Sequence, residues 1–135
     1  MDLILIIGVP GSGKTTLAKK IRQERMEEYK IFEADMFFER NGIYNWNPRL
    51  LGAAHKWCYD QVENALKQGE SVIVSNTSLI PKDRKPYLKL AKKYGANIEV
   101  FTCKGNFQNL HNVPDETIER MRQKFVPYSK NEENF

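Results

Sequence analysis

The chain has no long apolar run and few cysteines. No stretch of its 135 residues approaches the ~20 apolar residues that a membrane-spanning helix requires. Cys58 and Cys103 are its only cysteines; they lie far apart and match no zinc-binding spacing, which favours two reduced thiols. Charged residues make up 28% and hydrophobic residues 41% of the chain. This ordinary balance excludes a disordered chain and indicates one folded domain.

The first residues, MDLILIIG, lack the features of a secretion signal. Asp2 stands where a signal peptide is basic, and glycines follow in place of a small-residue cleavage site. We therefore expect a cytoplasmic protein. The formal net charge of +4 permits a phosphate-rich partner without requiring one.

Short apolar segments alternate with helical patterns along the chain. Strands are predicted at residues 3–7, 31–33, 71–75 and 97–102, and helices at 15–26, 48–67, 81–94 and 117–125. This alternation indicates right-handed βαβ units, and hence an α/β three-layer sandwich with a short parallel sheet of about four to five strands. We expect one domain over residues 1–126, followed by a polar tail, 127–135, that frays.

The segment GVPGSGKTT, residues 8–16, follows the first predicted strand and opens the first predicted helix. It fits the phosphate-binding pattern G-x-x-x-x-G-K-[ST] at every fixed position, in the structural setting that the pattern requires. Lys14 would neutralise the β- and γ-phosphates, and the Thr15 hydroxyl would bind Mg²⁺. The alternative is a glycine-rich turn without a ligand. We predict that ATP and Mg²⁺ bind here, with these residues at the nucleotide: Gly8, Pro10, Gly11, Ser12, Gly13, Lys14, Thr15 and Thr16.

Polar side chains follow the second and third predicted strands, where parallel sheets place their chemistry. Asp35 follows the second strand, and its carboxylate could accept a proton from an attacking hydroxyl or could cap the next segment. Ser75 and Asn76 end the third strand, where a motor-type NTPase carries an aspartate. These neutral residues could hold a metal-bound water or a substrate hydroxyl, or could only bond the turn.

A polar segment, residues 103–113, follows the fourth predicted strand, and the next helix carries Arg120 and Arg122. Such a segment could close over ATP as a lid and place a cation on the transferred phosphate. The same charges would also suit a solvated helix face.

Several stretches together resemble a known family: GVPGSGKTTLA, EADMFF, NGIYNWNP, AHKWC, VIVSNTSL and HNVPDETIERMRQKF. They are similar to the small P-loop kinases related to bacteriophage polynucleotide kinase, including stand-alone AAA-type ATP-binding proteins. The resemblance covers residues 3–125. It implies an adenylate-kinase-like core and ATP-dependent phosphorylation of a hydroxyl, with a nucleic acid 5′ end as the best-known acceptor. Asp35 occupies the place of the family's general base, and Asn76 stands where polynucleotide kinase has an aspartate.

The chain also departs from this family. Phe38 stands where polynucleotide kinase has a phosphate-holding arginine, although Arg40 is close. Phe107 and Gln108 stand where relatives often have lid arginines. We predict that Asp35, Phe38, Arg40 and Asn76 contact the acceptor, and that Lys14, Asp35, Arg120 and Arg122 take part in catalysis.

Three functions stay open from the sequence. The first is a kinase for a polynucleotide 5′-OH, and the second is a kinase for a nucleoside or another small metabolite. The third is an ATP-binding regulatory or interaction protein with little transfer activity.

Overall fold

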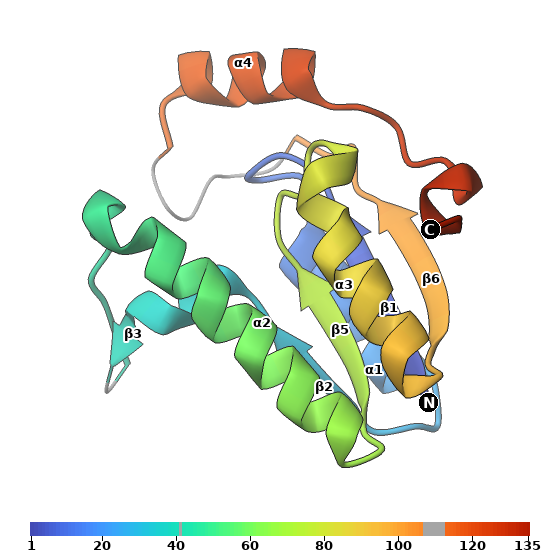
Figure 1. Ribbon diagram of the computed structural model, residues 1–135. Coiled ribbons are helices and arrows are strands. Elements are labelled where there is room, and N and C mark those ends of the chain that lie inside the picture. The colour runs from blue at the N-terminus through green and yellow to red at the C-terminus, as the bar shows by residue number, and fades with distance from the viewer. Residues whose placement is uncertain (41, 107–112) are drawn as a thin grey trace.

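The computed structural model describes residues 1–40, 42–106 and 113–135 (Figure 1). Four parallel strands form its main sheet, in the spatial order β2-β5-β1-β6. Their bounds are β1 Asp2–Ile7, β2 Tyr29–Phe32, β5 Ser71–Ser75 and β6 Asn97–Thr102. The predicted parallel α/β sheet is therefore confirmed.

Central strand β1 has apolar side chains on both faces, because helices cover both. Leu3, Leu5 and Ile7 belong to the core on one face, and Ile4 and Ile6 to the core on the other; all are at most 1% exposed. In a parallel sheet covered on both sides, alternate residues of a strand need apolar partners on opposite faces. The continuous run LILII meets this requirement.

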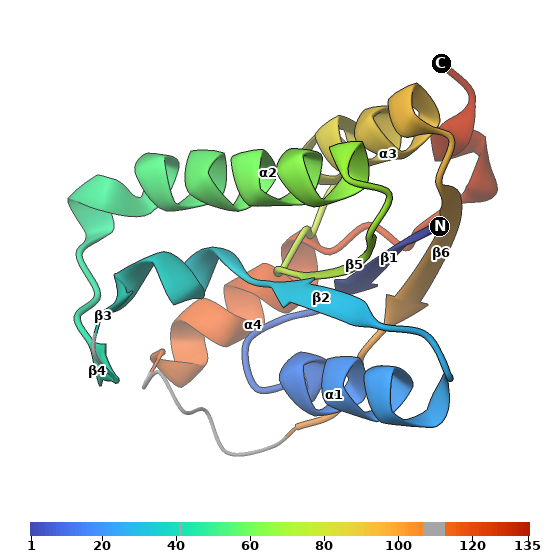
Figure 2. The same ribbon diagram turned by 90° about the horizontal axis from the view of Figure 1, so that it is seen from below.

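Three helices form the outer layers of the sandwich. Helix α1, Lys14–Glu24, covers one face of the sheet, and α2, Leu51–Lys67, and α3, Pro81–Tyr94, cover the other (Figures 1 and 2). A fourth helix, α4, Asp115–Lys124, lies across the carboxyl-end side of the sheet (Figure 1). It begins two residues before its predicted start because Asp115 and Glu116 in its first turn favour the positive helix end.

A small arm between β2 and α2 was not predicted. It contains the 3₁₀ turns η1, Ala34–Phe38, and η2, Pro48–Leu50, and the antiparallel strands β3, Glu39–Arg40, and β4, Ile43–Tyr44. Gly42, with φ of 78°, makes the tight turn between the strands. The predicted helix start at residue 48 is therefore a 3₁₀ turn, and α2 begins three residues later.

The C-terminal tail docks on the domain, contrary to the expected fraying. Its 3₁₀ turn η3, Lys130–Glu133, places the Glu132 carboxylate 2.9 Å from the Arg84 guanidinium. The Arg84 side chain is 0% exposed and Glu132 is 12% exposed. A buried cation needs a partner, so this ion pair holds the tail in place.

No helix in the described ranges combines the length and apolar character needed to cross a bilayer.

Candidate active site

The loop after β1 is built by glycines that other residues could not replace. Gly11 and Gly13 have φ of 78° and 101°, and Gly8 has φ of 153°. A Cβ atom on Gly8 would lie 2.6 Å from both the Cys103 carbonyl oxygen and Ser12 Oγ. Glycine at position 8 therefore allows the loop to pack against the segment that follows β6.

Neighbouring strand ends hold this loop from both sides. The Gly8 N–H donates to the Thr77 carbonyl at 3.1 Å, just after β5. On the other side, the Gly105 N–H donates to the Ser12 carbonyl at 3.2 Å. The loop leads directly into α1, whose N-terminus adds positive potential. The arrangement suits an anion such as a phosphate chain.

Lys14 lies at the start of α1 and turns back over the loop, where its Nζ donates to the Val9 carbonyl at 3.0 Å. Burial holds the pKa of the Lys14 ammonium below its usual value, although the nearby charges of Glu33 and Asp35 offset part of this effect. A desolvated ammonium is stabilised by an anionic partner. A bound triphosphate would provide one.

Oxygen atoms gather beside the loop in a pattern that fits a nucleotide-bound Mg²⁺. Thr15 Oγ1 donates to Glu33 Oε1 at 2.7 Å. Ser75 ends β5 beside Ile6 of β1. Its side chain lies on the same face of the sheet as Ile73, the face that α1 covers. Its buried Oγ has no hydrogen-bond partner in the structure. The described residues contain no cluster of three His, Cys, Asp or Glu side chains for a metal. Mg²⁺ on a nucleotide needs few protein ligands, because phosphates and waters supply the others.

Asp35 lies in η1, at the carboxyl end of β2, and contacts strand β4 of the same arm. The Tyr44 hydroxyl donates to Asp35 Oδ1 at 3.3 Å. Burial, together with the Asp35 charge, raises the pKa of Tyr44 to about 12, so the phenol stays a donor at neutral pH. Thr15, next to Lys14, bonds Glu33, which lies two residues before Asp35. The predicted base and the loop lysine therefore belong to segments that meet at the carboxyl edge of the sheet.

Asn76 supports the backbone next to Asp35. It is 7% exposed; its Oδ1 accepts from the Ala34 N–H at 2.8 Å, and its Nδ2 donates to Cys58 Sγ at 3.7 Å. Both ends of the amide therefore bind protein. These contacts fit the alternative in which Asn76 bonds neighbouring protein groups, here the backbone beside Asp35, and its contact with the acceptor stays a prediction.

Phe38 and Arg40 were both predicted to contact the acceptor. Phe38 is only 4% exposed and packs edge to face with Phe37 and Tyr44, at ring-centroid distances of 5.5 and 6.3 Å. It therefore builds the core beneath the site, and we do not place it at the acceptor. Arg40 belongs to β3, and its side chain lies outside the described part of the structure.

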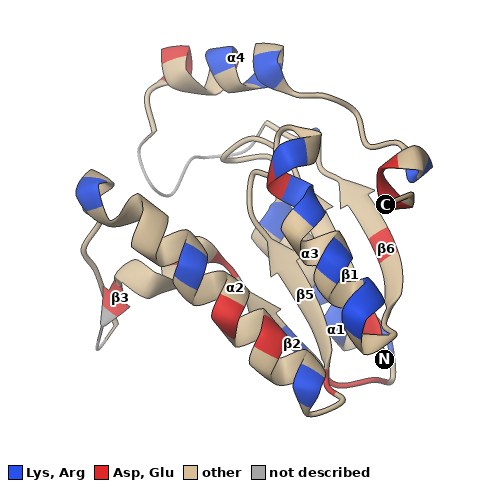
Figure 3. Ribbon diagram, in the orientation of Figure 1, with Lys and Arg blue, Asp and Glu red and all other residues tan. Residues whose placement is uncertain are grey.

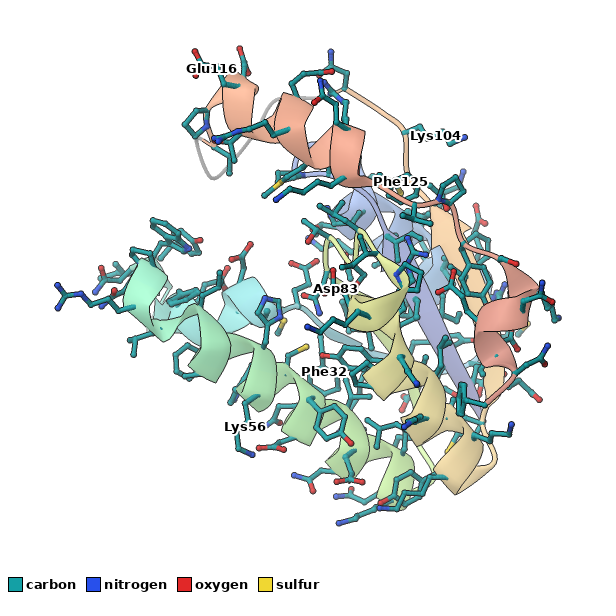
Figure 4. The ribbon with its side chains drawn as sticks, turned by 45° about the horizontal axis from the view of Figure 1, so that its top comes forward. Phe32, Lys56, Asp83, Lys104, Glu116 and Phe125 are labelled. Atoms are coloured by element: carbon teal, nitrogen blue, oxygen red, sulfur yellow. The ribbon has the colours of Figure 1, made fainter. Side chains whose placement is uncertain are left out.

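Helix α4 forms one wall of a cavity of about 210 Å³ beside the phosphate-binding loop. Its lining comprises Gly8, Val9, Thr102, Cys103, Lys104, Gly105, Arg122 and Phe125. Figure 4 shows Phe125 at the end of α4, with Lys104 on the segment after β6 nearby. Arg122 lines the cavity and pairs with Glu119 at 3.2 Å. Exposed Arg120, which donates to Thr117 Oγ1 at 3.3 Å, is not among the lining residues.

Most of the predicted lid, including Phe107 and Gln108, falls within residues 107–112, outside the described residues.

Two side chains in this site were not assigned their roles from the sequence. Glu33 directly follows β2. Because the carboxyl ends of parallel strands lie at one edge of the sheet, its position could have indicated the contact with Thr15. Tyr44 was not among the predicted site residues, and its bond to Asp35 depends on the β3–β4 arm, which was not predicted. No sequence pattern pointed to that bond.

Comparison with known proteins identifies the domain. Residues 3–128 match the AAA domain family. The chain belongs to this family, which confirms the resemblance drawn from its motifs. Human NEDD4-binding protein 2 is 30% identical to this AAA domain over 134 residues, which cover 91% of the chain and 8% of that protein. A protein of Autographa californica nuclear polyhedrosis virus, named as a bifunctional polynucleotide kinase/RNA ligase, is 25% identical over 93% of the chain and 21% of its own length. The AAA domain thus spans less than a quarter of either relative.

Solved structures share the fold at low sequence identity. The Sinorhizobium meliloti gluconokinase has a TM-score of 0.62 at 16% identity, covering 93% of this chain and 75% of that one. The Mycobacterium tuberculosis APS kinase CysC has a TM-score of 0.60 at 15% identity, covering 91% and 95%. A chain of the Pnkp1/Rnl/Hen1 complex has a TM-score of 0.61 at 20% identity, covering 99% and 43%. The domain therefore has the P-loop kinase fold.

Proposed function

We propose that this AAA domain transfers the γ-phosphoryl group of ATP to a hydroxyl, and that a polynucleotide 5′-OH is the acceptor. The observation that carries the proposal is the 2.7 Å hydrogen bond from Thr15 to Glu33, because it joins the phosphate-binding loop to the segment that carries Asp35. A viral relative named as a polynucleotide kinase supports the choice of acceptor.

The loop and its flanking oxygens hold the phosphates. Backbone N–H groups of residues 8–15 and the Lys14 ammonium bind the triphosphate. Thr15 would bind Mg²⁺, and Glu33, which accepts a hydrogen bond from Thr15, would hold its waters together with Ser75 at the end of β5. The ion would neutralise the negative charge that develops on the transferred phosphoryl group. The nucleoside end occupies the cavity lined by Val9, Phe125 and Arg122.

Asp35 receives the proton of the acceptor hydroxyl. The acceptor oxygen forms a bond to the γ-phosphorus, the bond from that phosphorus to the β–γ bridging oxygen breaks, and ADP leaves. Tyr44 orients the Asp35 carboxylate through its hydrogen bond, and Asn76 fixes the backbone on which Asp35 stands. These contacts keep the base in place before substrate arrives.

Surface charge favours a phosphate-bearing acceptor. Lysines occupy exposed positions along α3, and only Asp83 interrupts the basic series on that helix (Figure 3). The basic positions are Lys82, Lys85, Lys89, Lys92 and Lys93. Such a surface attracts a nucleic acid backbone.

A small metabolite is the second candidate acceptor. The specific observation in its favour is Phe38, a buried ring where polynucleotide kinase has a phosphate-holding arginine. A phosphate-bearing acceptor would lack the cation that binds its phosphate at this position. An acceptor without a phosphate does not need that cation.

Transfer of radiolabel from γ-labelled ATP tests the proposal. Oligonucleotides of DNA and RNA with 5′-hydroxyl ends should be labelled in preference to nucleosides and sugars. Asp35→Asn should lower transfer by about 10²–10⁴-fold with ATP affinity retained. Asp60→Asn, which removes a carboxylate that is 47% exposed on α2, is the matched control and should leave transfer unchanged. Labelling of the small molecules alone would favour a metabolite kinase, and ATP binding without any labelled acceptor would favour a regulatory protein.

A further inference from the structure

Arg84 is a fully buried arginine of α3, at 0% exposure. Its Nε donates to the Ser78 carbonyl at 2.9 Å, and its Nη2 donates to the Leu79 carbonyl at 3.0 Å and to the Val126 carbonyl. Its Nη1 donates to Glu132 at 2.9 Å. A buried guanidinium is costly unless its donors are satisfied, and here most of them bind backbone carbonyls from two distant segments.

The first of these segments is the turn at residues 76–79, between β5 and α3. Ser78 has φ of 44°, an unusual value for a residue other than glycine. Arg84 bonds the carbonyls of Ser78 and Leu79, so it holds this turn in its conformation. A sparsely populated backbone geometry persists only where surrounding contacts fix it.

The turn contacts all three parts of the proposed site. Asn76 accepts from the Ala34 N–H beside Asp35, and the Thr77 carbonyl accepts from the Gly8 N–H of the phosphate-binding loop. The Leu79 carbonyl accepts from the Val126 N–H at 2.8 Å, just after α4. Hydrogen bonds from this one turn therefore reach the segment beside Asp35, the loop and the end of α4, and the loop has a second support in the bond from the Gly105 N–H to the Ser12 carbonyl.

The second segment is the end of α4, which forms the cavity wall. The Arg84 guanidinium lies 5.6 Å from the centroid of the Phe125 ring and bonds the Val126 carbonyl. Phe125 and Arg122 line the 210 Å³ cavity with Gly8. Arg84 thus ties the wall of the cavity to the same turn that bonds the loop.

We propose that Arg84 is a positioning residue for nucleotide binding. It locks the end of α4 to the turn at Ser78 and Leu79, and so sets the wall that receives the nucleoside end of ATP. The inference rests on the proposed function only in that ATP binds at the loop. It concerns the nucleoside part of the ligand, because the phosphates are held by the loop and Lys14.

Calorimetric titration with two ligands tests this role. ATP reaches the loop and the α4 wall, whereas inorganic tripolyphosphate reaches only the loop. Arg84→Lys keeps the charge but loses the planar fork that joins three carbonyls. We expect ATP affinity to fall about tenfold, and tripolyphosphate affinity to change by less than about twofold. A merely structural loss would weaken both ligands alike.

Two further variants keep the test decisive. Glu132→Gln leaves Arg84 and its carbonyl bonds in place but removes the ion pair. It should therefore also weaken ATP binding more than tripolyphosphate binding, with a smaller loss of ATP affinity than Arg84→Lys. Lys67→Met removes an exposed cation from the end of α2 and should change neither affinity. Thermal unfolding of each variant checks that the domain is folded.

Equal weakening of ATP and tripolyphosphate in both Arg84→Lys and Glu132→Gln would overturn the inference, as would no change in either. Failure of the proposed function looks different. In that case the wild-type protein binds ATP, the selectivity persists, and no acceptor is labelled.

Discussion

The proposed phosphate-binding side and the proposed acceptor side of this site are built in different ways. The phosphate-binding side is one continuous loop, residues 8–15, which would act mainly through its backbone N–H groups, helped by Lys14 and Thr15. The acceptor side is assembled from separate segments: Asp35 from η1, Tyr44 from β4 and Asn76 from the end of β5. Its geometry exists only when the sheet and the arm have formed.

This difference shows how each side tolerates change. A continuous loop fails when its own backbone or its one cation is altered. An assembled side depends on hydrogen bonds between distant residues, so losing one supporting bond should misplace Asp35 without affecting phosphate binding. Mutations that separate ATP affinity from transfer therefore test the comparison directly.

Among the four changes considered next, removal of the Lys14 ammonium from the loop should have the largest effect. Lys14→Ala removes the ammonium that neutralises the phosphates, and we expect transfer to fall about 10²–10³-fold together with ATP affinity. Titration calorimetry and a labelling assay measure the two losses. Lys19→Ala, an exposed lysine on α1, should leave both unchanged. Full activity in Lys14→Ala would remove the loop from the mechanism.

Changing the loop backbone should have the next largest effect. Gly8→Ala places a methyl group 2.6 Å from the Cys103 carbonyl, at a φ that alanine rarely adopts, so we expect about 1–3 kcal/mol of lost stability and weaker ATP binding. Gly52→Ala is the matched control, because its methyl group has open space in helix α2 and should stabilise by up to about 1 kcal/mol. Urea unfolding compares them. If the two variants unfold alike, the tight approach at Gly8 is wrong.

Loss of a support on the acceptor side should have a moderate effect that spares ATP binding. Asn76→Ala leaves the buried Ala34 N–H without its partner, which should cost about 1–3 kcal/mol and lower transfer. Asn76→Asp keeps an oxygen that can accept the Ala34 N–H bond, so this variant should retain more stability and more transfer than Asn76→Ala. Urea unfolding, ATP titration and labelling separate the outcomes, and a parallel loss of ATP affinity in Asn76→Ala would contradict the division into two sides.

The smallest effect concerns alkaline pH. The folded state raises the pKa of Tyr44 to about 12, from about 10 in an unfolded chain. Between these values the folded protein keeps a proton that the unfolded chain releases, so stability present below about pH 10 falls as the pH rises toward 12. Tyr44→Phe should flatten this decline in urea unfolding curves. The part that remains is due to the other tyrosines whose pKa is raised, Tyr29, Tyr87, Tyr94 and Tyr128. An unchanged slope would contradict the hydrogen bond between Tyr44 and Asp35.

The sheet and the loop could be predicted because their signals are local. The apolar runs at residues 3–7 and 71–75 encode strands covered on both faces, and the loop motif lies between a strand and a helix. The arm and the docked tail could not be predicted in this way. Their short 3₁₀ turns and two-residue strands carry weak periodicity. The tail is held by contacts with α3 that join residues far apart in the sequence, among them the Arg84–Glu132 ion pair and the bond from Lys92 to the Phe135 carbonyl.

By itself the sequence determined the parallel α/β core, the phosphate-binding loop and the placement of Asp35 after the second strand. These depend on the periodicity of apolar residues and on the backbone freedom of glycine, which act over a few neighbouring positions. Only the tertiary structure decided that Phe38 is buried, that Asn76 supports Ala34, and that Arg84 ties the end of α4 to the turn after β5. The physical reason is that hydrogen bonding and burial of a polar side chain depend on which distant segments the fold brings to it.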